Sequence, residues 1–107
     1  MKWTVHGREG AKLDSEVKGR RPAKVAGVLD ELLADGSMVL FNPPGRQIIT
    51  LNPTAALIWE CCDGAHTVAA IADEVRDVFP DAPAVERETG ALLDALRAKG
   101  MVIDAID

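Results

Sequence analysis

The middle of the chain alternates short apolar runs with turn residues, which is the pattern of an antiparallel sheet. Residues 28–33 contain a first short strand, residues 38–41 a second and residues 47–51 a third. Asp35-Gly36 is a hairpin signal between the first two strands. The turn before the third strand is Asn42-Pro43-Pro44-Gly45, because proline fixes φ and glycine accepts positive φ. The pattern predicts a three-stranded antiparallel meander.

After Asn52 the apolar spacing changes from the period of a strand to that of a helix. Asn52-Pro53 starts a first helix, since asparagine caps and proline suits the first helical position, and Asp63-Gly64 ends it. Thr67 caps a second helix, and a third runs from about residue 83 to residue 99. The inward stripes of the three helices are Leu51, Ala55, Ile58 and Cys62; then Val68, Ile71, Val75 and Val78 or Phe79; then Val85, Thr89, Leu92 and Leu96.

A meander followed by three short helices predicts an α+β domain that is winged helix-turn-helix-like. We place this domain over residues 25–107, because a chain of 107 residues suffices for one modest hydrophobic core. Residues 1–24 are polar, contain several glycines and have no sustained period, so we predict a flexible N-terminal tail. The alternative is a segment that orders on a partner. Aromatic residues make up only 4% of the chain, so we expect an aliphatic core.

The charge balance and the cysteines disfavour several functions. The formal net charge is -5, and the one short basic cluster, within residues 18–24, precedes the predicted domain, so nucleic acid is a disfavoured partner. The first residues carry charges rather than the apolar stretch of a signal peptide, and no apolar run is long enough to span a membrane. Cys61 and Cys62 are neighbours, which form no disulfide framework and lack metal-ligand spacing. We therefore expect a reducing, cytoplasmic setting.

Candidate catalytic chemistry is sparse. His6 lies in the predicted tail, and His66 lies in a surface turn without a partner motif. Cys61 and Cys62 fit best as small apolar residues at the end of a helix, where the negative end of the dipole disfavours a thiolate. The acidic residues within 73–77 form the solvated face of the second helix. The sequence therefore predicts no catalytic residue, no metal site and no cofactor, and a protein that is not an enzyme.

The third strand is the first of two surfaces that indicate a binding module. It would lie at the margin of a small open sheet, where unpaired N–H and C=O groups can accept an extended peptide as an added strand. If Ile49 and Leu51 enter the core, Ile48 remains at the surface; the alternative is that Ile48 packs beneath the tail. The candidate peptide-binding residues of this strand are Gln47, Ile48, Ile49, Thr50 and Leu51.

The third helix is the second surface, because it has another face beside its core stripe. Glu86, Gly90, Leu93 and Arg97 recur there at helical spacing. A glycine inside a helix costs about 1 kcal/mol relative to alanine, which suggests close approach by another backbone or side chain. Leu93 would offer an apolar contact within a polar rim of Glu86 and Arg97. The alternative is an ordinary surface leucine with a tolerated glycine. A peptide-binding groove would form only if this face and the third strand lie side by side.

The stretch from residue 49 to residue 60 resembles the PqqD family when it is taken with residues downstream. It is Ile-Thr-Leu-Asn-Pro-Thr-Ala-Ala-Leu-Ile-Trp-Glu, and Cys62-Asp63-Gly64, Thr67-Val68 and Ile71 follow it. The resemblance covers about residues 25–102, and its most specific part is the Leu-Asn-x-Thr-Ala…Asp-Gly set. The later residues that also match the family are Val85, Leu92, Leu93, Leu96, Gly100, Met101 and Val102.

This resemblance implies a peptide chaperone, a recognition element for ribosomally made and modified peptides (a RiPP recognition element). Such a domain binds the leader of a precursor peptide as an added strand on its third strand, against its third helix, and delivers it to a modifying enzyme. That partner is often a radical S-adenosylmethionine enzyme, as in biosynthesis of pyrroloquinoline quinone (PQQ), and iron–sulfur clusters belong to the partner. Carried over, the binding strand is Gln47–Leu51 and the helix covers residues 85–97. The long tail and the Cys61-Cys62 pair depart from the family and leave the pathway open.

Two other functions remain open on the residues alone. A winged-helix DNA-binding protein would place the third helix in the major groove, but the helix cations Arg87, Arg97 and Lys99 are matched by acidic neighbours. A regulatory or structural subunit of a larger complex would require no peptide. Exposed strand margins would also allow a homodimer.

Overall fold

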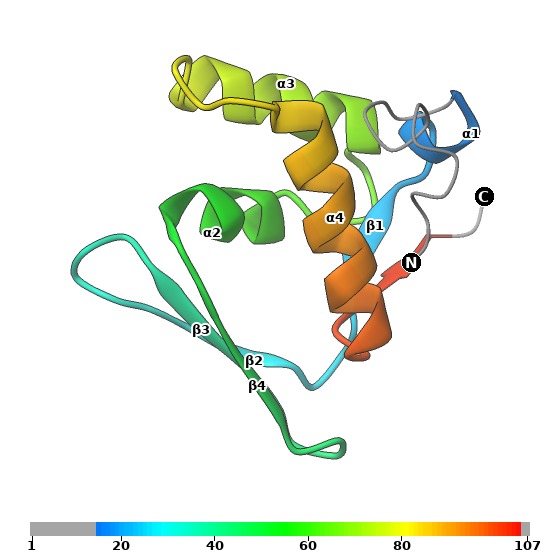
Figure 1. The fold of residues 1–107 in the computed structure, drawn as a ribbon. Coiled ribbons are helices and arrows are strands. Elements are labelled where there is room, and N and C mark those ends of the chain that lie inside the picture. The colour runs from blue at the N-terminus through cyan, green and yellow to red at the C-terminus, as the bar shows by residue number, and fades with distance from the viewer. Residues whose placement is uncertain (1–14, 106–107) are drawn as a thin grey trace.

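The computed structural model describes residues 15–105. Its helices are α1 (Ser15–Lys18), α2 (Pro53–Glu60), α3 (Val68–Val78) and α4 (Val85–Ala98). Its strands are β1 (Pro22–Lys24), β2 (Leu29–Leu32), β3 (Met38–Asn42), β4 (Gln47–Leu51) and β5 (Val102–Asp104). The strands β2, β3 and β4 form one sheet, and α2, α3 and α4 gather on one side of it (Figure 1).

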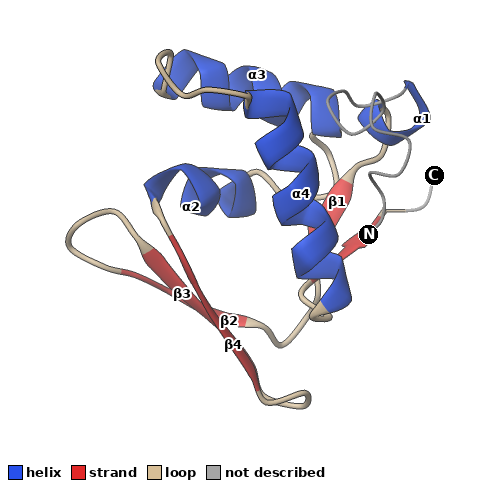
Figure 2. Cartoon of the chain, viewed as in Figure 1, coloured by secondary structure: helices blue, strands red, loops and turns tan. Residues whose placement is uncertain are grey.

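This sheet is the predicted three-stranded antiparallel meander, with the order β2-β3-β4 (Figure 2). Gly36 permits the hairpin between β2 and β3, because its φ of 91° lies in the left-handed region. The Leu33 amide donates to the Ser37 carbonyl at 2.8 Å and closes that hairpin. Leu40 and Leu51 are buried, so one face of the sheet packs against the helices.

Two of the three predicted helices, α2 and α3, begin at their predicted capping residues, whereas α4 follows Ala84 without a side-chain cap. Asn52 caps α2 by accepting a hydrogen bond from the Ala55 amide at 2.8 Å. Thr67 caps α3 in the same way, through the Ala70 amide at 3.1 Å. Gly64, with a φ of 78°, turns the chain between α2 and α3. The α+β fold predicted from the sequence is therefore confirmed.

A second sheet of two strands pairs β1 with β5 and joins the two ends of the described chain. Pro22 is buried, and its carbonyl accepts a hydrogen bond from the Gly64 amide at 2.9 Å. Residues 15–24 therefore belong to the fold, and the prediction that the tail extends to residue 24 is wrong. The rest of the predicted tail, residues 1–14, lies outside the described residues. The sequence does not predict β1, because three residues are too few to show a period.

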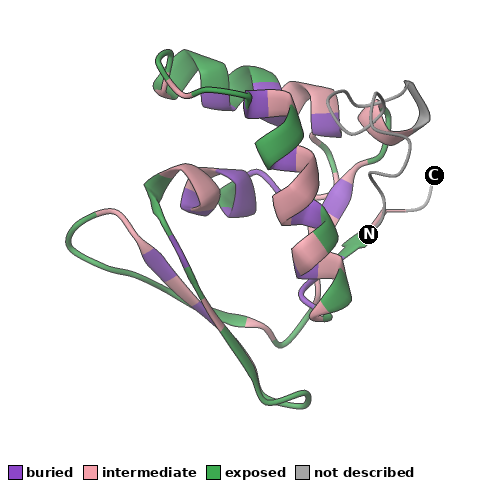
Figure 3. Ribbon diagram, viewed as in Figure 1, coloured by how far each residue is buried: buried purple, intermediate pink, exposed green. Residues whose placement is uncertain are grey.

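The core between the sheet and the helices is mainly aliphatic, with Trp59 as its fully buried aromatic residue (Figure 3). Trp59 is 1% exposed, and its indole N–H donates to the Asp30 carboxylate on β2 at 2.8 Å. Lys24 of β1 lies over the same ring, with its Nζ 5.2 Å from the ring centroid. Trp59 thus links β1, β2 and α2, which fixes the meander relative to the helices.

Candidate peptide-binding site

β4 forms one margin of the meander, and within residues 15–105 it pairs only with β3. The hydrogen bond that closes the β2–β3 hairpin fixes the alternation of the ladder, since paired and unpaired positions alternate along an antiparallel strand. By that alternation the odd-numbered residues of β4 turn their N–H and C=O groups towards β3. The N–H and C=O groups of Ile48 and Thr50 point away from the sheet.

The side chains of β4 alternate as predicted. Leu51 is 2% exposed and Ile49 is half-buried, so both face the helices. Ile48 is 66% exposed on the opposite face, and no part of the described structure covers it. Gln47 and Thr50 are also exposed. Ile48 and Thr50 therefore combine unpaired main-chain groups with accessible side chains, which an added strand requires.

The two ends of β4 relate to α4 in different ways. At the hairpin end, the Asn42 side-chain amide donates to the carbonyl of Lys99 at 3.4 Å and to that of Gly100 at 3.3 Å. Gly100 permits this approach, because its φ is 72° and an added Cβ would lie 3.2 Å from the Asn42 amide nitrogen. At the other end, Asn52 lines the same pocket as the N-terminal half of α4. A contact therefore joins α4 to the β3–β4 hairpin, and a shared pocket lies between α4 and the end of β4.

The prediction that Leu93 offers an exposed apolar contact on α4 is wrong. Leu93 is 1% exposed and belongs to the core. Glu86 is ion-paired with an arginine of α3 at 3.1 Å, and Arg97 is ion-paired with Asp104 of β5 at 2.8 Å. Ion pairs to α3 and β5 therefore hold the two ends of this face, on which Gly90 is half-buried. The spacing predicted a single inward stripe, whereas α4 packs over a wider arc because it has neighbours on more than one side.

A different face of α4 borders a pocket of about 610 Å³, which lies between α2, the N-terminal half of α4 and the loop before it. Leu92, which the sequence placed in the core, is half-buried and lines this pocket. Ala84 belongs to the loop and has a φ of 51°, an unusual left-handed conformation for a residue with a side chain. The α4 residues in the lining are Val85, Arg87, Glu88, Thr89, Ala91 and Leu92.

The pocket face of α4 carries little sequence signal. Ala91 is small, and Arg87 and Glu88 look like solvated surface charges. The sequence feature that indicates this face is the helical spacing of Glu88, Ala91 and Leu92, which lie beside the core stripe of α4.

Comparison with known proteins identifies the family. Residues 37–102 match the family model described as coenzyme PQQ synthesis protein D (PqqD). The chain belongs to the PqqD family. PqqA binding protein 2 of Pseudomonas putida (strain KT2440) is 38% identical over 55 residues, which cover 51% of this chain and 61% of that relative. PqqA binding protein of Pseudomonas syringae pv. syringae (strain B728a) is 33% identical over 69 residues, which cover 64% of this chain and 71% of that relative.

Two solved structures share the fold of this PqqD-family chain. TbiB1 in complex with the TbiA(beta) leader peptide has a TM-score of 0.67 at 21% identity, over 79% of this chain and 99% of that chain. Lasso peptide synthetase B1 complexed with the leader peptide has a TM-score of 0.64 at 25% identity, over 78% of this chain and 98% of that chain. The PqqD resemblance and the α+β fold are thus supported by sequence and by structure.

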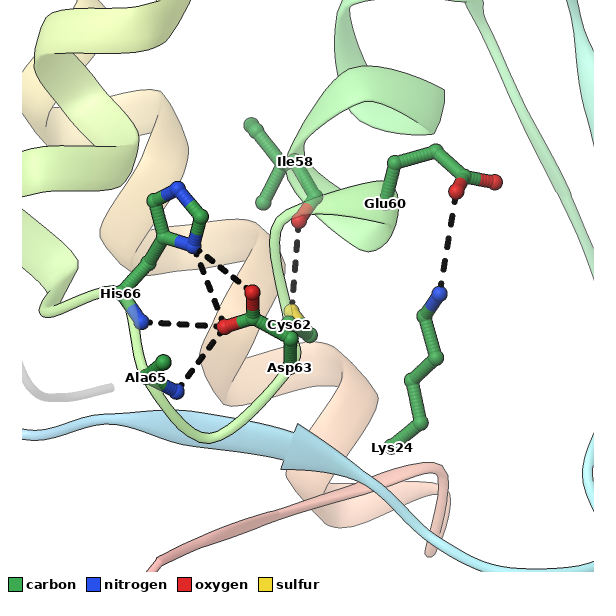
Figure 4. Close-up of polar contacts among 7 residues, drawn as sticks. All are labelled: Lys24, Ile58, Glu60, Cys62, Asp63, Ala65 and His66. Atoms are coloured by element: carbon green, nitrogen blue, oxygen red, sulfur yellow. Dashed lines mark hydrogen bonds and ion pairs between the residues drawn. The ribbon is translucent and has the colours of Figure 1, made fainter.

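The turn after α2 in this PqqD-family chain is held by a carboxylate (Figure 4). Asp63 accepts hydrogen bonds from the amides of His66 at 3.0 Å and Ala65 at 2.9 Å, and its carboxylate also lies 3.0 Å from the His66 ring Nδ1. These hydrogen bonds hold the pKa of Asp63 well below its usual range, and the bond from the His66 amide has the largest effect. The geometry gives His66 a structural role in closing a surface turn.

The adjacent cysteines are buried free thiols. Burial raises the pKa of Cys62 to about 12, and its Sγ donates to the Ile58 carbonyl at 3.3 Å (Figure 4). Burial also raises the pKa of Cys61. Both thiols therefore stay protonated at neutral pH, where a nucleophile or a metal ligand would need the thiolate.

Neither a metal-binding cluster nor a membrane-spanning helix is present in residues 15–105. Residues 15–105 contain no group of three or more His, Cys, Asp and Glu side chains placed to hold a metal ion. Over the same residues, no helix has the length and apolar character needed to cross a membrane.

Proposed function

We propose that this PqqD-family protein binds the leader of a ribosomally made precursor peptide and presents it to a modifying enzyme. The observation that carries the proposal is the margin of β4, where the N–H and C=O groups of Ile48 and Thr50 point away from the sheet. An extended guest that pairs with these groups becomes a fourth strand. Because the pairing uses main-chain groups, it gives affinity that depends little on the guest's sequence.

The pocket between α2 and α4 supplies the selectivity in this proposal. It begins where β4 ends, since Asn52 follows β4 directly and lines the pocket. Ala55, Ile58 and Leu92 give it an apolar wall, so a guest side chain inserted there would leave water. The peptide-binding residues we propose are therefore 47–51 together with the pocket face of α4, in place of the face from Glu86 to Arg97.

The similar proteins support this assignment. The Pseudomonas relatives are named as PqqA binding proteins, and both solved structures with this fold contain a leader peptide. We propose by analogy that the guest is a PqqA-like leader or one from a related peptide pathway. The partner in this proposal is a radical S-adenosylmethionine enzyme, with PQQ biosynthesis as the pathway of reference. The protein itself acts in the cytoplasm by binding, without catalysis.

A nuclear magnetic resonance titration tests the proposal. The ¹⁵N-labelled protein is titrated with the synthetic leader of the precursor peptide encoded beside its gene, and the same precursor without its leader is the control ligand. We expect shifts in the amides of residues 47–51 and on the pocket face of α4, while the amides of β1 and β5 stay unchanged. Absence of binding by every neighbouring precursor, or shifts confined to β1 and β5, would reject the proposal.

The DNA-binding alternative has little support from α4. Arg97 is held by Asp94 at 3.0 Å and by Asp104 at 2.8 Å, so it is not free to contact a phosphate. The net charge of -5 also opposes the approach of a polyanion. A peptide is therefore the better-supported partner.

A further inference from the structure

An exposed apolar row crosses the face of the meander that points away from the helices. Leu29, Phe41 and Ile48 lie opposite one another on β2, β3 and β4. Their exposed fractions are 57%, 38% and 66%. In the described part of the chain, every other large exposed apolar side chain except Val78 and Ile103 also lies on or beside this sheet. Apolar side chains exposed singly are normal, whereas a contiguous row indicates an interaction surface.

The core of this protein does not require the row. Its residues alternate along each strand with the residues that face the helices, so they make no part of the buried layer. The neighbouring row on the outer face consists of Glu31, Val39 and Thr50, and it holds polar residues at both margins of the sheet. Packing among residues 15–105 therefore leaves the apolar row unexplained, which points to a partner as its occupant.

The size of the outer face restricts which partner can cover it. With strands about 4.8 Å apart and a rise of about 3.4 Å per residue, three strands of about five residues span about 14 Å by 17 Å, or roughly 240 Å². A stable dimer needs about 800 Å² from each partner. Two copies of this chain packed through this face alone would therefore separate. A partner that covers the row must also contact something beyond the sheet.

We infer that the outer face docks the peptide-modifying enzyme once the leader is bound. This inference rests on the proposed function, in which the leader becomes a fourth strand beside β4. The outward side chains of that strand would continue the row of Leu29, Phe41 and Ile48, so the surface is complete only on the loaded protein. Glu31 is the only charged residue among the outward positions of β2, β3 and β4, and the matching enzyme surface is therefore apolar at its centre.

Two variants separate enzyme docking from leader binding. The double variant Leu29→Thr with Phe41→Thr makes the outer face polar and leaves β4 unchanged. Val78→Thr is the matched control, because Val78 is 56% exposed on α3, away from the sheet. Fluorescence anisotropy with the labelled leader should give a Kd within about twofold of wild type for every variant. Biolayer interferometry against the purified modifying enzyme encoded beside this gene should show that loaded wild type binds at least about tenfold tighter than empty protein. The double variant should lose that gain, and Val78→Thr should keep it.

The outcomes are distinguishable. An unchanged enzyme affinity in the double variant, or equal affinities of loaded and empty wild type, overturns the inference. Absence of leader binding by wild type in the anisotropy assay sinks the proposed function itself, since that assay involves no enzyme. Sedimentation equilibrium of wild type tests the other occupant: a dimer that the double variant abolishes assigns the face to a second copy of this chain and overturns enzyme docking.

Discussion

A proline at position 50 should distinguish strand addition from other ways of binding a peptide. The Thr50 N–H points away from β3, so Thr50→Pro removes one donor from the margin and leaves the β3–β4 ladder in place. The Thr50 side chain is exposed, so its replacement opens no cavity in the core. In the loaded protein, the guest carbonyl opposite position 50 would lose its partner, and the proline ring would lie in the path of the incoming strand.

The expected loss of affinity follows from one hydrogen bond. Such a bond contributes about 0.5–1.5 kcal/mol net, and a partner left unpaired away from water costs about 1–3 kcal/mol. Leader affinity should therefore fall by about 1–3 kcal/mol, or roughly 5- to 150-fold at about 1.4 kcal/mol per tenfold. Thr50→Val keeps the N–H and the shape of the side chain, so it should bind the leader like wild type.

Leu32→Pro is the matched control on the opposite margin of the sheet. Leu32 belongs to β2, its N–H also points away from β3, and its side chain is 66% exposed. Urea unfolding should show similar losses of stability in the two proline variants, whereas isothermal titration calorimetry should show weaker leader binding only for Thr50→Pro. If both folded variants bind the leader with equal affinity, strand addition on β4 is the wrong mechanism.

Three further perturbations test other parts of the structure. Leu93→Ala should lower the free energy of unfolding by about 2–5 kcal/mol, because it opens a cavity in the core. Leu92→Ala should cost less stability and mainly raise the leader Kd. Urea unfolding and calorimetry check both variants, and a larger loss of stability in Leu92→Ala than in Leu93→Ala would contradict the positions of these leucines. Asn42→Asp places a carboxylate at the negative end of α4, so it should lower the free energy of unfolding by about 1 kcal/mol and weaken leader binding. If the variant equals wild type in both assays, the contact between Asn42 and the end of α4 is dispensable. The pKa of Cys62 is raised from 9.0 to about 12, so its contribution to stability is complete below about pH 9 and is lost as the pH rises towards 12, because the unfolded thiol ionises first. The native protein should accordingly resist iodoacetamide at about pH 8 and react after unfolding in urea, and rapid alkylation of native Cys62 would contradict its burial.

Local features determined the order of the elements in this protein. The caps at Asn52 and Thr67 act through hydrogen bonds to amides three residues away, and Gly36 acts through its own φ. Such features depend on nearby residues alone, so the meander, the helices and the exposure of Ile48 were predicted correctly. The Leu-Asn-x-Thr-Ala…Asp-Gly set also indicated the family, because it joins a strand end, a helix cap and a helix stop in one short stretch.

Only the tertiary structure decided which face of α4 borders the pocket and where the fold begins. Leu92 and Leu93 both fit an inward stripe at helical spacing, and the neighbours α3 and β5 select Leu93 for the core. β1 joins the fold by pairing with β5, whose residues lie far from it along the chain. Such pairing depends on burial and loop closure more than on local propensity. Helical spacing indicates which residues are buried, but the direction from which a neighbouring helix or strand packs depends on the tertiary arrangement of the helices and sheets.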